Sequence, residues 1–227
     1  MPKRPLVPIP LFPLPNVVHF PGTDLRLHVF EPRYRQMVRD VLALAPQERW
    51  IGMVLLRPGW DPRDPAPAIF DAGTAGRLES HDPLPDGRSN ILLHGEFRFE
   101  LEREVPSEPY RRALVRPVAE DHLQQADPTV IALRRELLRL TQTLKQELGA
   151  RFPFDEDDLG DLAQADLNGL VNRLAADLDV PALRKQVLLG EDLEERGASV
   201  LRILRSRGRV LDLLRPYRRF ADNSENN

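Results

Sequence analysis

Residues 91–105 read ILLHGEFRFELEREV, and this stretch decides the fold. Its even positions are mostly charged and its odd positions are mostly apolar, the apolar ones being Ile91, Leu93, Phe97, Phe99, Leu101 and Val105. Because successive side chains of a strand point to opposite faces, this alternation predicts one long strand with a single buried face. Gly95 shares the apolar register but has no side chain to pack, so it predicts a bulge or a sharp bend.

The sequence before this stretch predicts further strands and one helix. Pro85-Asp86-Gly87 is a turn that joins the long strand to an earlier one around residues 76–81 in a hairpin. Apolar runs predict strands at 25–30 and 50–56. Between these two, Pro32 opens a helix, and its apolar residues have helical spacing: Tyr34, Met37, Val38, Val41 and Leu42. Several short strands with one inserted helix predict a small closed or half-closed barrel.

The second half of the chain follows a different pattern. Of the 22 prolines, 18 fall in residues 1–118, and apolar residues beyond that point recur every three or four positions. That spacing predicts amphipathic helices over 128–148, 163–178, 181–189 and 193–214. We therefore expect an α+β protein of two domains: a β-barrel at 1–118 and an α-helical bundle at 119–220, followed by a disordered tail at 221–227.

Composition excludes several classes of protein. The 227 residues include no cysteine, which rules out disulfides, thiolate nucleophiles and cysteine-ligated metals. The net charge of −3 weighs against a nucleic-acid-binding protein, which usually carries a basic excess. Prolines interrupt the apolar residues near the N-terminus, and no apolar run approaches the length of a membrane span. We therefore expect a cytoplasmic protein without membrane contact.

Residues able to carry chemistry are present, but their spacing does not suit catalysis. No two of the five histidines lie three to five residues apart, as a helical metal site requires, although strands that join His28 and His94 are one alternative. No serine lies in a GxSxG turn, and no Gly-Lys pair exists to form a phosphate-binding loop. The acidic residues at 155–161 suit a helix N-terminus better than a cation site. We expect no catalytic residue, no metal and no cofactor.

Four stretches of the chain resemble the N-terminal, substrate-binding domain of Lon proteases. They are PLFPLPNVVHFPG at 10–22, LHVFEPRYRQM at 27–37, LLHGEFR at 92–98 and RKQVLLGEDLEER at 184–196. The resemblance covers residues 8–207 in the family's order, and it implies a PUA-like β pseudobarrel followed by a helical bundle. In full-length Lon this region recognises substrates and does no chemistry. About twenty residues follow Arg207, too few for an ATPase or a peptidase, so the chain resembles the free-standing form of the domain.

The resemblance implies a non-catalytic module that binds unfolded or flexible polypeptide, or a protein partner in protein quality control. Trp60, in the proline-rich loop 57–67, is one predicted contact, because loops and tryptophans often carry recognition. Phe12 and Phe30 complete the predicted set. We expect them to line an apolar groove on the barrel or at its junction with the bundle, or to lie beside a strand edge that an extended peptide joins.

Two alternatives of other classes remain open. The first is binding of RNA or an acidic partner through the arginine-rich last helix, with Arg202, Arg205 and Arg209 as its candidate face. The second is an uncharacterised hydrolase, which requires a cleft with a strongly perturbed titratable group. The sequence identifies neither the partner nor the oligomeric state.

Overall fold

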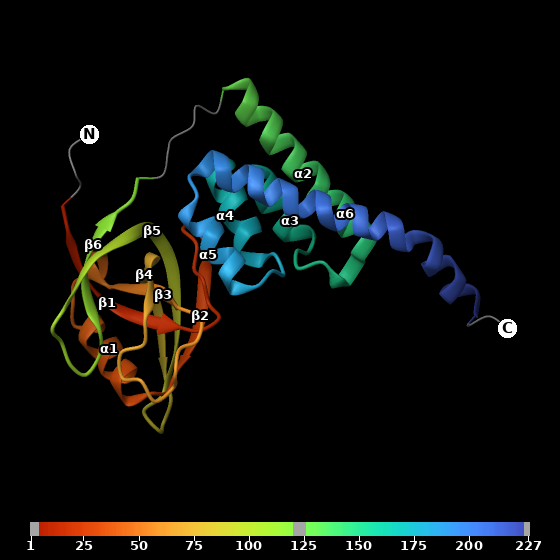
Figure 1. Cartoon of the computed structure of the whole chain (residues 1–227). Helices are drawn as coiled ribbons and strands as arrows, with labels where there is room; N and C mark the ends of the chain where they lie inside the picture. Colours follow the sequence, from red (N-terminus) through yellow and green to blue (C-terminus); the bar gives the residue numbers. More distant parts are fainter. Residues whose placement is uncertain (1–4, 120–125, 225–227) are drawn as a thin grey trace. The chain divides into compact units, whose positions relative to one another are not determined.

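The computed structural model of the chain describes residues 5–119 and 126–224. Its elements, drawn in Figure 1, divide into two compact units, which confirms the α+β class. The barrel unit comprises Met1–Asp121 and Leu178–Asp192, and the helical unit comprises His122–Asp177 and Leu193–Asn227. The segment Leu178–Asp192, which the sequence pattern assigned to the bundle, therefore groups with the strands.

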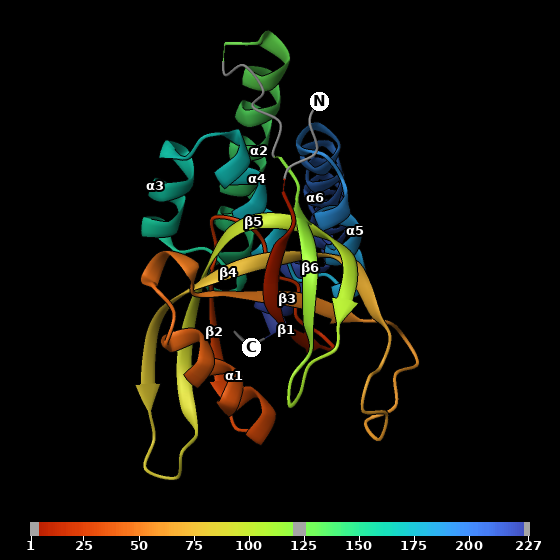
Figure 2. The same ribbon diagram turned by 90° about the vertical axis from the view of Figure 1, so that its left-hand side faces the viewer.

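The barrel unit is built on one six-stranded sheet that closes on itself. Its strands are β1 (Val7–Leu14), β2 (Asp24–Val29), β3 (Trp50–Leu56), β4 (Ile69–Pro83), β5 (Ser89–Val105) and β6 (Arg112–Pro117). Their order is β2-β5-β4-β3-β1-β6, and β6 also pairs with β5, so that five strands form a ring and β2 lies outside it (Figure 2). The β1–β3 pair is parallel and the other pairs are antiparallel.

Strand β5 is the long strand that the alternation predicted, and three other strands pair with it. It pairs with β4 from Ser89 to Glu100, with β2 along its first half and with β6 along its second half. Gly95 N donates to the Thr23 carbonyl at 2.9 Å and the Gly95 carbonyl accepts from Gly22 N at 2.8 Å, with Gly22 at φ 72°. Gly22 and Thr23 together oppose Gly95, and the β4–β5 register shifts between Ala75 and Gly76, which pair with Phe97 and Gly95. Strand β5 therefore has one extra residue next to Gly95, which confirms the bulge predicted there.

Strand β1 tolerates its prolines because each half of the strand pairs on one side. Val7–Pro10 pairs with β6, whereas Leu11–Leu14 pairs with β3. Proline has no N–H to donate, so it fits where one side of the strand has no hydrogen-bonding neighbour. The prolines of β1 are therefore compatible with a strand at this place in the ring.

Two apolar clusters fill the barrel unit. One consists of residues from the ring strands: Ile9, Leu11, Val54, Leu56, Ile69, Ala75, Phe99, Ala113 and Val115. The other lies beneath the predicted inserted helix, α1 (Pro32–Leu42), and its strand residues are Phe12, Val29, Ile51, Met53, Leu78, Ile91 and Leu93. A short 3-10 helix, η1 (Pro46–Glu48), follows α1. The sheet is thus packed on both faces, which is typical of a barrel with a covering helix.

Helix α5 (Ala182–Gly190) is bonded to the strands by two buried polar side chains. The Arg98 guanidinium, on β5, donates to the carbonyls of Leu189 and Glu191 at 2.7 and 2.8 Å. Gln186 of α5 donates to the Ala72 carbonyl of β4 at 3.0 Å. The last carbonyls of a helix have no partner within it, so a guanidinium beside them satisfies groups that would otherwise be costly to bury.

The helical unit contains α2 (Pro128–Leu148), η2 (Gly149–Arg151), α3 (Glu156–Gln164), α4 (Leu167–Asp177) and α6 (Leu193–Ser224). Asp127 caps α2 by accepting from Thr129 N at 2.8 Å. Asp155 and Asp158 form a reciprocal capping box at the start of α3, which explains the acidic run at 155–161. The prediction of a single helix over 163–178 is wrong, because α3 ends and α4 begins within this range.

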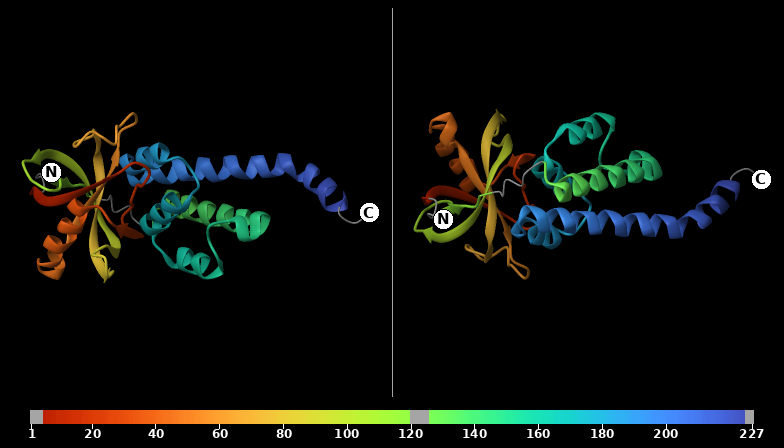
Figure 3. Two further views of the ribbon diagram at one scale, coloured as in Figure 1. Left: turned by 90° about the horizontal axis from the view of Figure 1, so that it is seen from below. Right: turned by 90° about the horizontal axis from the view of Figure 1, so that it is seen from above.

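Helix α6 carries a buried arginine at one end and an exposed stretch at the other. Arg196 has 0% exposure and donates to the Asn172 side chain on α4. The second half of α6 runs past the end of α2 (Figure 3). Val210 and Leu213, also in the second half of α6, are exposed. The helix reaches Ser224, so it includes part of the predicted tail, and 225–227 lie outside the described residues. No described helix has both the length and the apolar character of a membrane span.

The substitution Gly95→Ala tests the bulge. An added Cβ would lie 2.2 Å from the Phe20 carbonyl oxygen, and we expect this overlap to lower the free energy of unfolding by about 1–3 kcal/mol. Urea unfolding followed by tryptophan fluorescence measures the barrel unit, because Trp50 and Trp60 both belong to it. Gly160→Ala in α3, where nothing lies within 4 Å of the added Cβ, is the control and should not move this transition. Equal transitions for both variants would contradict the close approach.

Candidate polypeptide-binding surfaces

The loop that carries Trp60 is bonded to the barrel near both of its ends. The Arg57 side chain donates to the Ile69 carbonyl at 2.8 Å, and the Arg111 guanidinium donates to the Pro67 carbonyl at 2.7 Å. The Trp60 side chain is 39% exposed. The loop therefore presents part of an indole ring on a well-bonded backbone, which keeps the entropic cost of a contact low.

Phe12 lies in the core and not on a surface. It is 5% exposed, and its ring centroid lies 4.1 Å from that of Tyr34 on α1. Residues Ile9 to Pro13 of β1 are all buried, so this part of the strand has no exposed face. The structure thus gives Phe12 a packing role beneath α1, which does not fit the direct contact predicted for it.

Phe30 follows β2 directly and is 59% exposed. Its ring stacks with the His28 imidazole, at a centroid distance of 6.3 Å. His28 Nδ1 lies 2.8 Å from Asn90 Oδ1, and His28 Nε2 lies 3.4 Å from an Arg88 nitrogen. Phe30 is therefore an exposed aromatic side chain next to polar residues of the β4–β5 hairpin.

Strand β2 ends the strand order, so within the described residues its outer side is a free sheet edge. Its side chains alternate between two environments. Leu25 and Leu27 pack against the apolar cluster beneath α1, whereas Asp24, Arg26 and His28 are exposed. The alternation was visible in the sequence, but the position of the strand at an edge was not.

The backbone of β2 presents hydrogen-bonding groups along this edge. Gly95 N donates to the Thr23 carbonyl, and this bond sets the phase of the β2–β5 ladder. In an antiparallel ladder, residues that bond the neighbouring strand alternate with residues that face away from it. The odd-numbered residues of β2 therefore bond β5. The even-numbered residues, from Asp24 to His28, direct their N–H and C=O groups outward.

A buried histidine closes the turn that leads into this edge. His19 is 3% exposed, its Nε2 lies 2.9 Å from the Thr23 carbonyl oxygen, and its Nδ1 has no hydrogen-bond partner among the described residues. A carbonyl oxygen accepts only, so Nε2 carries the proton and Nδ1 carries none. Burial lowers the pKa of His19 from 6.5, an effect larger than the opposing one of the Thr23 carbonyl. His19 is therefore neutral when it stabilises the turn.

The three arginines predicted as a basic face lie on α6 and are exposed. Arg202 donates to the Ser199 hydroxyl at 2.7 Å, and the Arg205 guanidinium lies 3.4 Å from the Glu136 carboxylate of α2. Arg209 lines, with Arg205, a groove of about 350 Å³ between α2 and α6. Two of the three side chains thus make contacts within the helical unit, and these contacts lend no support to binding of RNA or an acidic partner.

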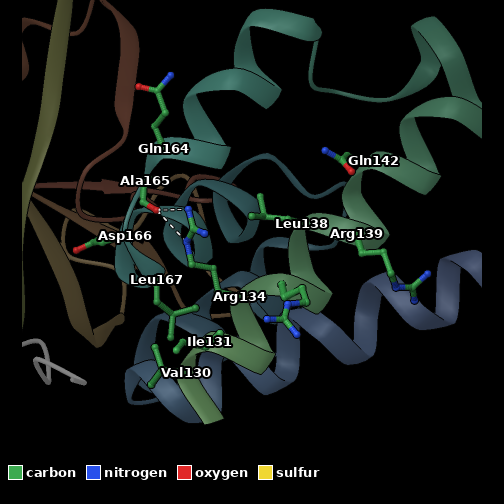
Figure 4. A pocket seen from close by; sticks show the side chains of 11 residues that line it. Val130, Ile131, Arg134, Leu138, Arg139, Gln142, Gln164, Ala165, Asp166 and Leu167 are labelled. Atoms are coloured by element: carbon green, nitrogen blue, oxygen red, sulfur yellow. Dashed lines mark hydrogen bonds between the residues drawn. The ribbon is translucent and has the colours of Figure 1, made fainter. Parts of the chain in front are cut away.

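The helical unit also has an open hollow of about 610 Å³ between α2 and the α3–α4 turn (Figure 4). Arg134 donates to the carbonyls of Ala163 and Ala165 at the end of α3. Arg139 hydrogen-bonds to Glu136 and lowers the pKa of that carboxyl to about 2. Sequence reasoning missed this hollow because its lining comes from three helices. Two of its three arginines, Arg134 and Arg139, are bonded to a helix end and a carboxylate, so these two act as structural groups.

Among the described residues, no three histidine, aspartate or glutamate side chains are grouped as metal ligands. His28 and His94, the pair left as an alternative, hydrogen-bond to Asn90 and Asp24 at 2.8 and 2.7 Å. His122 lies outside the described residues.

One tyrosine has a strongly shifted titration. Burial, together with the Asp40 carboxylate that accepts from its hydroxyl at 2.8 Å, raises the pKa of Tyr110 to about 12. A phenol with this pKa stays protonated near pH 7, so it bonds to α1 as a donor and is a poor general base.

These features define the class of the protein: an α+β chain with a PUA-like pseudobarrel, a helix inserted between its strands, and a second unit made of helices. The chain matches the model of the ATP-dependent protease La (LON) substrate-binding domain over residues 8–206. It therefore belongs to the Lon substrate-binding domain family, which confirms the resemblance seen in the sequence.

Relatives with known names agree with this assignment. The Lon protease of Cytophaga hutchinsonii is 26% identical over 209 residues, which cover 91% of this chain and 25% of that protease. The Lon protease of Anaeromyxobacter dehalogenans is 28% identical over 206 residues, which cover 90% of this chain and 24% of that protease. The chain thus spans about a quarter of the length of these relatives.

Solved structures support the fold. The N-terminal domain of a Mycobacterium avium complex Lon protease superposes with a TM-score of 0.66 at 16% identity, covering 87% of this chain and 96% of that one. A Lon N-terminal domain protein from Xanthomonas campestris gives a TM-score of 0.59 at 26% identity, and the match covers 86% of this chain and 97% of that one.

The buried His19 predicts a pH-dependent stability. Because the native pKa of His19 lies below 6.5, its value in the unfolded chain, the unfolded state takes up the proton first. The stability present at neutral pH is therefore lost as the pH falls below 6.5, by up to about 1.4 kcal/mol per pH unit until the native pKa is reached. Urea unfolding of the wild type and of His19→Gln, followed by tryptophan fluorescence from neutral pH to about pH 5, measures it. The variant should lose this part of the pH dependence; identical slopes would contradict the assignment.

Proposed function

We propose that this chain is a non-catalytic module that binds unfolded or flexible segments of polypeptide through its barrel unit. The family carries the proposal, because the matched domain is named for binding the substrate of an ATP-dependent protease. The substrates of a protease are polypeptides of varied sequence, so such a domain must contact chains without a fixed partner sequence. A role in cytoplasmic protein quality control is part of the same proposal.

Two exposed aromatic side chains of the barrel unit support the choice of surface. Phe30 and Trp60 are 59% and 39% exposed, and each is attached to a strand end or to a bonded loop. Aromatic side chains contribute a large contact area for few rotatable bonds, and they are frequent anchors in protein interfaces. The 227 residues contain no Gly-Lys pair for a phosphate-binding loop, which favours a binding role for them over ATP hydrolysis.

Binding to a permanently unfolded reporter, such as reduced and carboxymethylated α-lactalbumin, tests the proposal by fluorescence anisotropy. We expect Phe30→Ala and Trp60→Ala each to weaken binding by about tenfold or more, as for truncated interface anchors. Leu44→Ala is the matched control, because Leu44 is an apolar residue of the same unit with 44% exposure.

The proposal fails if the wild-type chain does not bind the reporter. The choice of surface fails if the two aromatic variants bind as tightly as Leu44→Ala. Far-UV circular dichroism of each variant separates a lost contact from a lost fold.

A further inference from the structure

We infer that an extended segment joins the free edge of β2 as an added strand, and that it carries an acidic residue between apolar ones. This inference rests on the proposed function and specifies the surface and the chemistry of the ligand. It starts from the strand order, in which β2 pairs with β5 and has no second neighbour among the described residues.

The backbone of β2 supplies the attraction. Its even-numbered residues, Asp24, Arg26 and His28, point their N–H and C=O groups away from β5. Main-chain hydrogen bonds to such an edge bind polypeptide of varied sequence, because every residue except proline offers the same donor and acceptor. This property suits a domain whose ligands share no sequence.

The two faces of β2 determine which side chains the segment carries. An added strand extends both faces of the sheet, and its side chains lie about 4.5–5.5 Å from those directly opposite. On one face they meet Leu25 and Leu27, which pack on the cluster beneath α1. On the other face they meet the exposed Arg26 and His28. A segment of alternating apolar and polar residues therefore matches the edge, and Phe30 lies at the end of the strand for a further apolar contact.

The charges on the polar face select an acidic residue. Asp24 lies 2.7 Å from His94 Nδ1, and Arg88 pairs with Asp86 at 2.6 Å. The Arg26 guanidinium is exposed and forms no ion pair within the described part of the chain. Opposite charges placed directly across two strands stabilise the pair by a few tenths to about 1 kcal/mol. Arg26 is therefore the charged residue of β2 that has no oppositely charged partner within the described residues. An acidic side chain opposite Arg26 would supply that partner.

The same charge disfavours a second copy of this chain as the occupant. Two β2 edges that pair symmetrically about Arg26 would bring their Arg26 side chains directly opposite each other. Like charges in that position destabilise a strand pair, and natural sheets use charged edges to prevent self-association. The edge thus favours a foreign segment of complementary charge.

Short capped peptides of alternating valine and threonine, with glutamate or lysine at the central polar position, provide the probe. We expect the full chain to bind the glutamate peptide more tightly than the lysine peptide in isothermal titration. Two further sets of peptides are N-methylated at alternate residues, one set at the odd positions (one phase) and the other at the even positions (the other phase). They test the main-chain hydrogen bonds between the peptide and β2. One phase should weaken binding by about tenfold or more and the other should be tolerated, because alternate N–H groups of a strand point to the same side.

Two variants of Arg26 separate the contribution of its backbone N–H to binding from the contribution of its charge. Arg26→Pro removes an outward N–H that β5 does not use, and proline is tolerated on an edge strand. We expect it to weaken both peptides by about tenfold or more. Arg26→Gln retains the N–H and should bind the glutamate and lysine peptides equally. Circular dichroism verifies that both variants fold. If Arg26→Pro does not fold, the methylated peptides still test the backbone hydrogen bonds on the wild-type chain.

Equal tolerance of both methylation phases, or unchanged binding by a folded Arg26→Pro, would overturn the inference. Equal affinity of the wild type for the two peptides would overturn the acidic preference. If Arg26→Pro still binds the unfolded reporter and Phe30→Ala does not, the proposed function stands and the edge is not its site. If neither the reporter nor any peptide binds the wild type, the proposed function itself fails.

Discussion

Hydrogen bonding along β5 is the constraint on which the barrel unit depends. One strand of 17 residues bonds β4 on one side and, on the other, first β2 and then β6. The ring closes at the β5–β6 pair, so a slip of β5 by one residue would move its apolar side chains to the opposite face of the sheet. The bulge at Gly95 is where the partner changes, and only a residue without a side chain allows the Phe20 carbonyl to approach so closely.

The same change of partner explains why the barrel has an edge. Because β6 takes the second half of β5, β2 bonds only the first half and remains outside the ring. The turn before β2 is fixed by His19 and by the Thr74 hydroxyl, which donates to the His19 carbonyl at 2.6 Å. The edge is therefore held in place before any ligand arrives, and a segment that binds there need not order the protein as well.

Much of the fold could be predicted from the sequence, because strands and helices have local periods. The alternation at 91–105, the turn at 85–87 and the inserted helix are all confirmed. The site could not be predicted as well, because it depends on contacts between residues far apart in sequence. Phe12 was predicted as a contact residue, but β1 is buried on both faces at this position. Arg26 was not predicted as a contact residue, because the sequence does not show that β2 lies at a sheet edge. Arg98, a cation between Glu96 and Glu100 on the polar face of its strand, was a sign in the sequence of the buried contact with α5.

The insertion of α5 into the barrel unit has a consequence for the order in which the protein forms. The chain leaves the barrel unit at Asp121 and returns to it at Leu178, after α2, α3 and α4. During synthesis all six strands emerge first, while two acceptors of Arg98, the Leu189 and Glu191 carbonyls, are still to be made. A ribosome-bound barrel therefore lacks these two bonds to α5, and they form only after the translation of three helices that belong to the other unit.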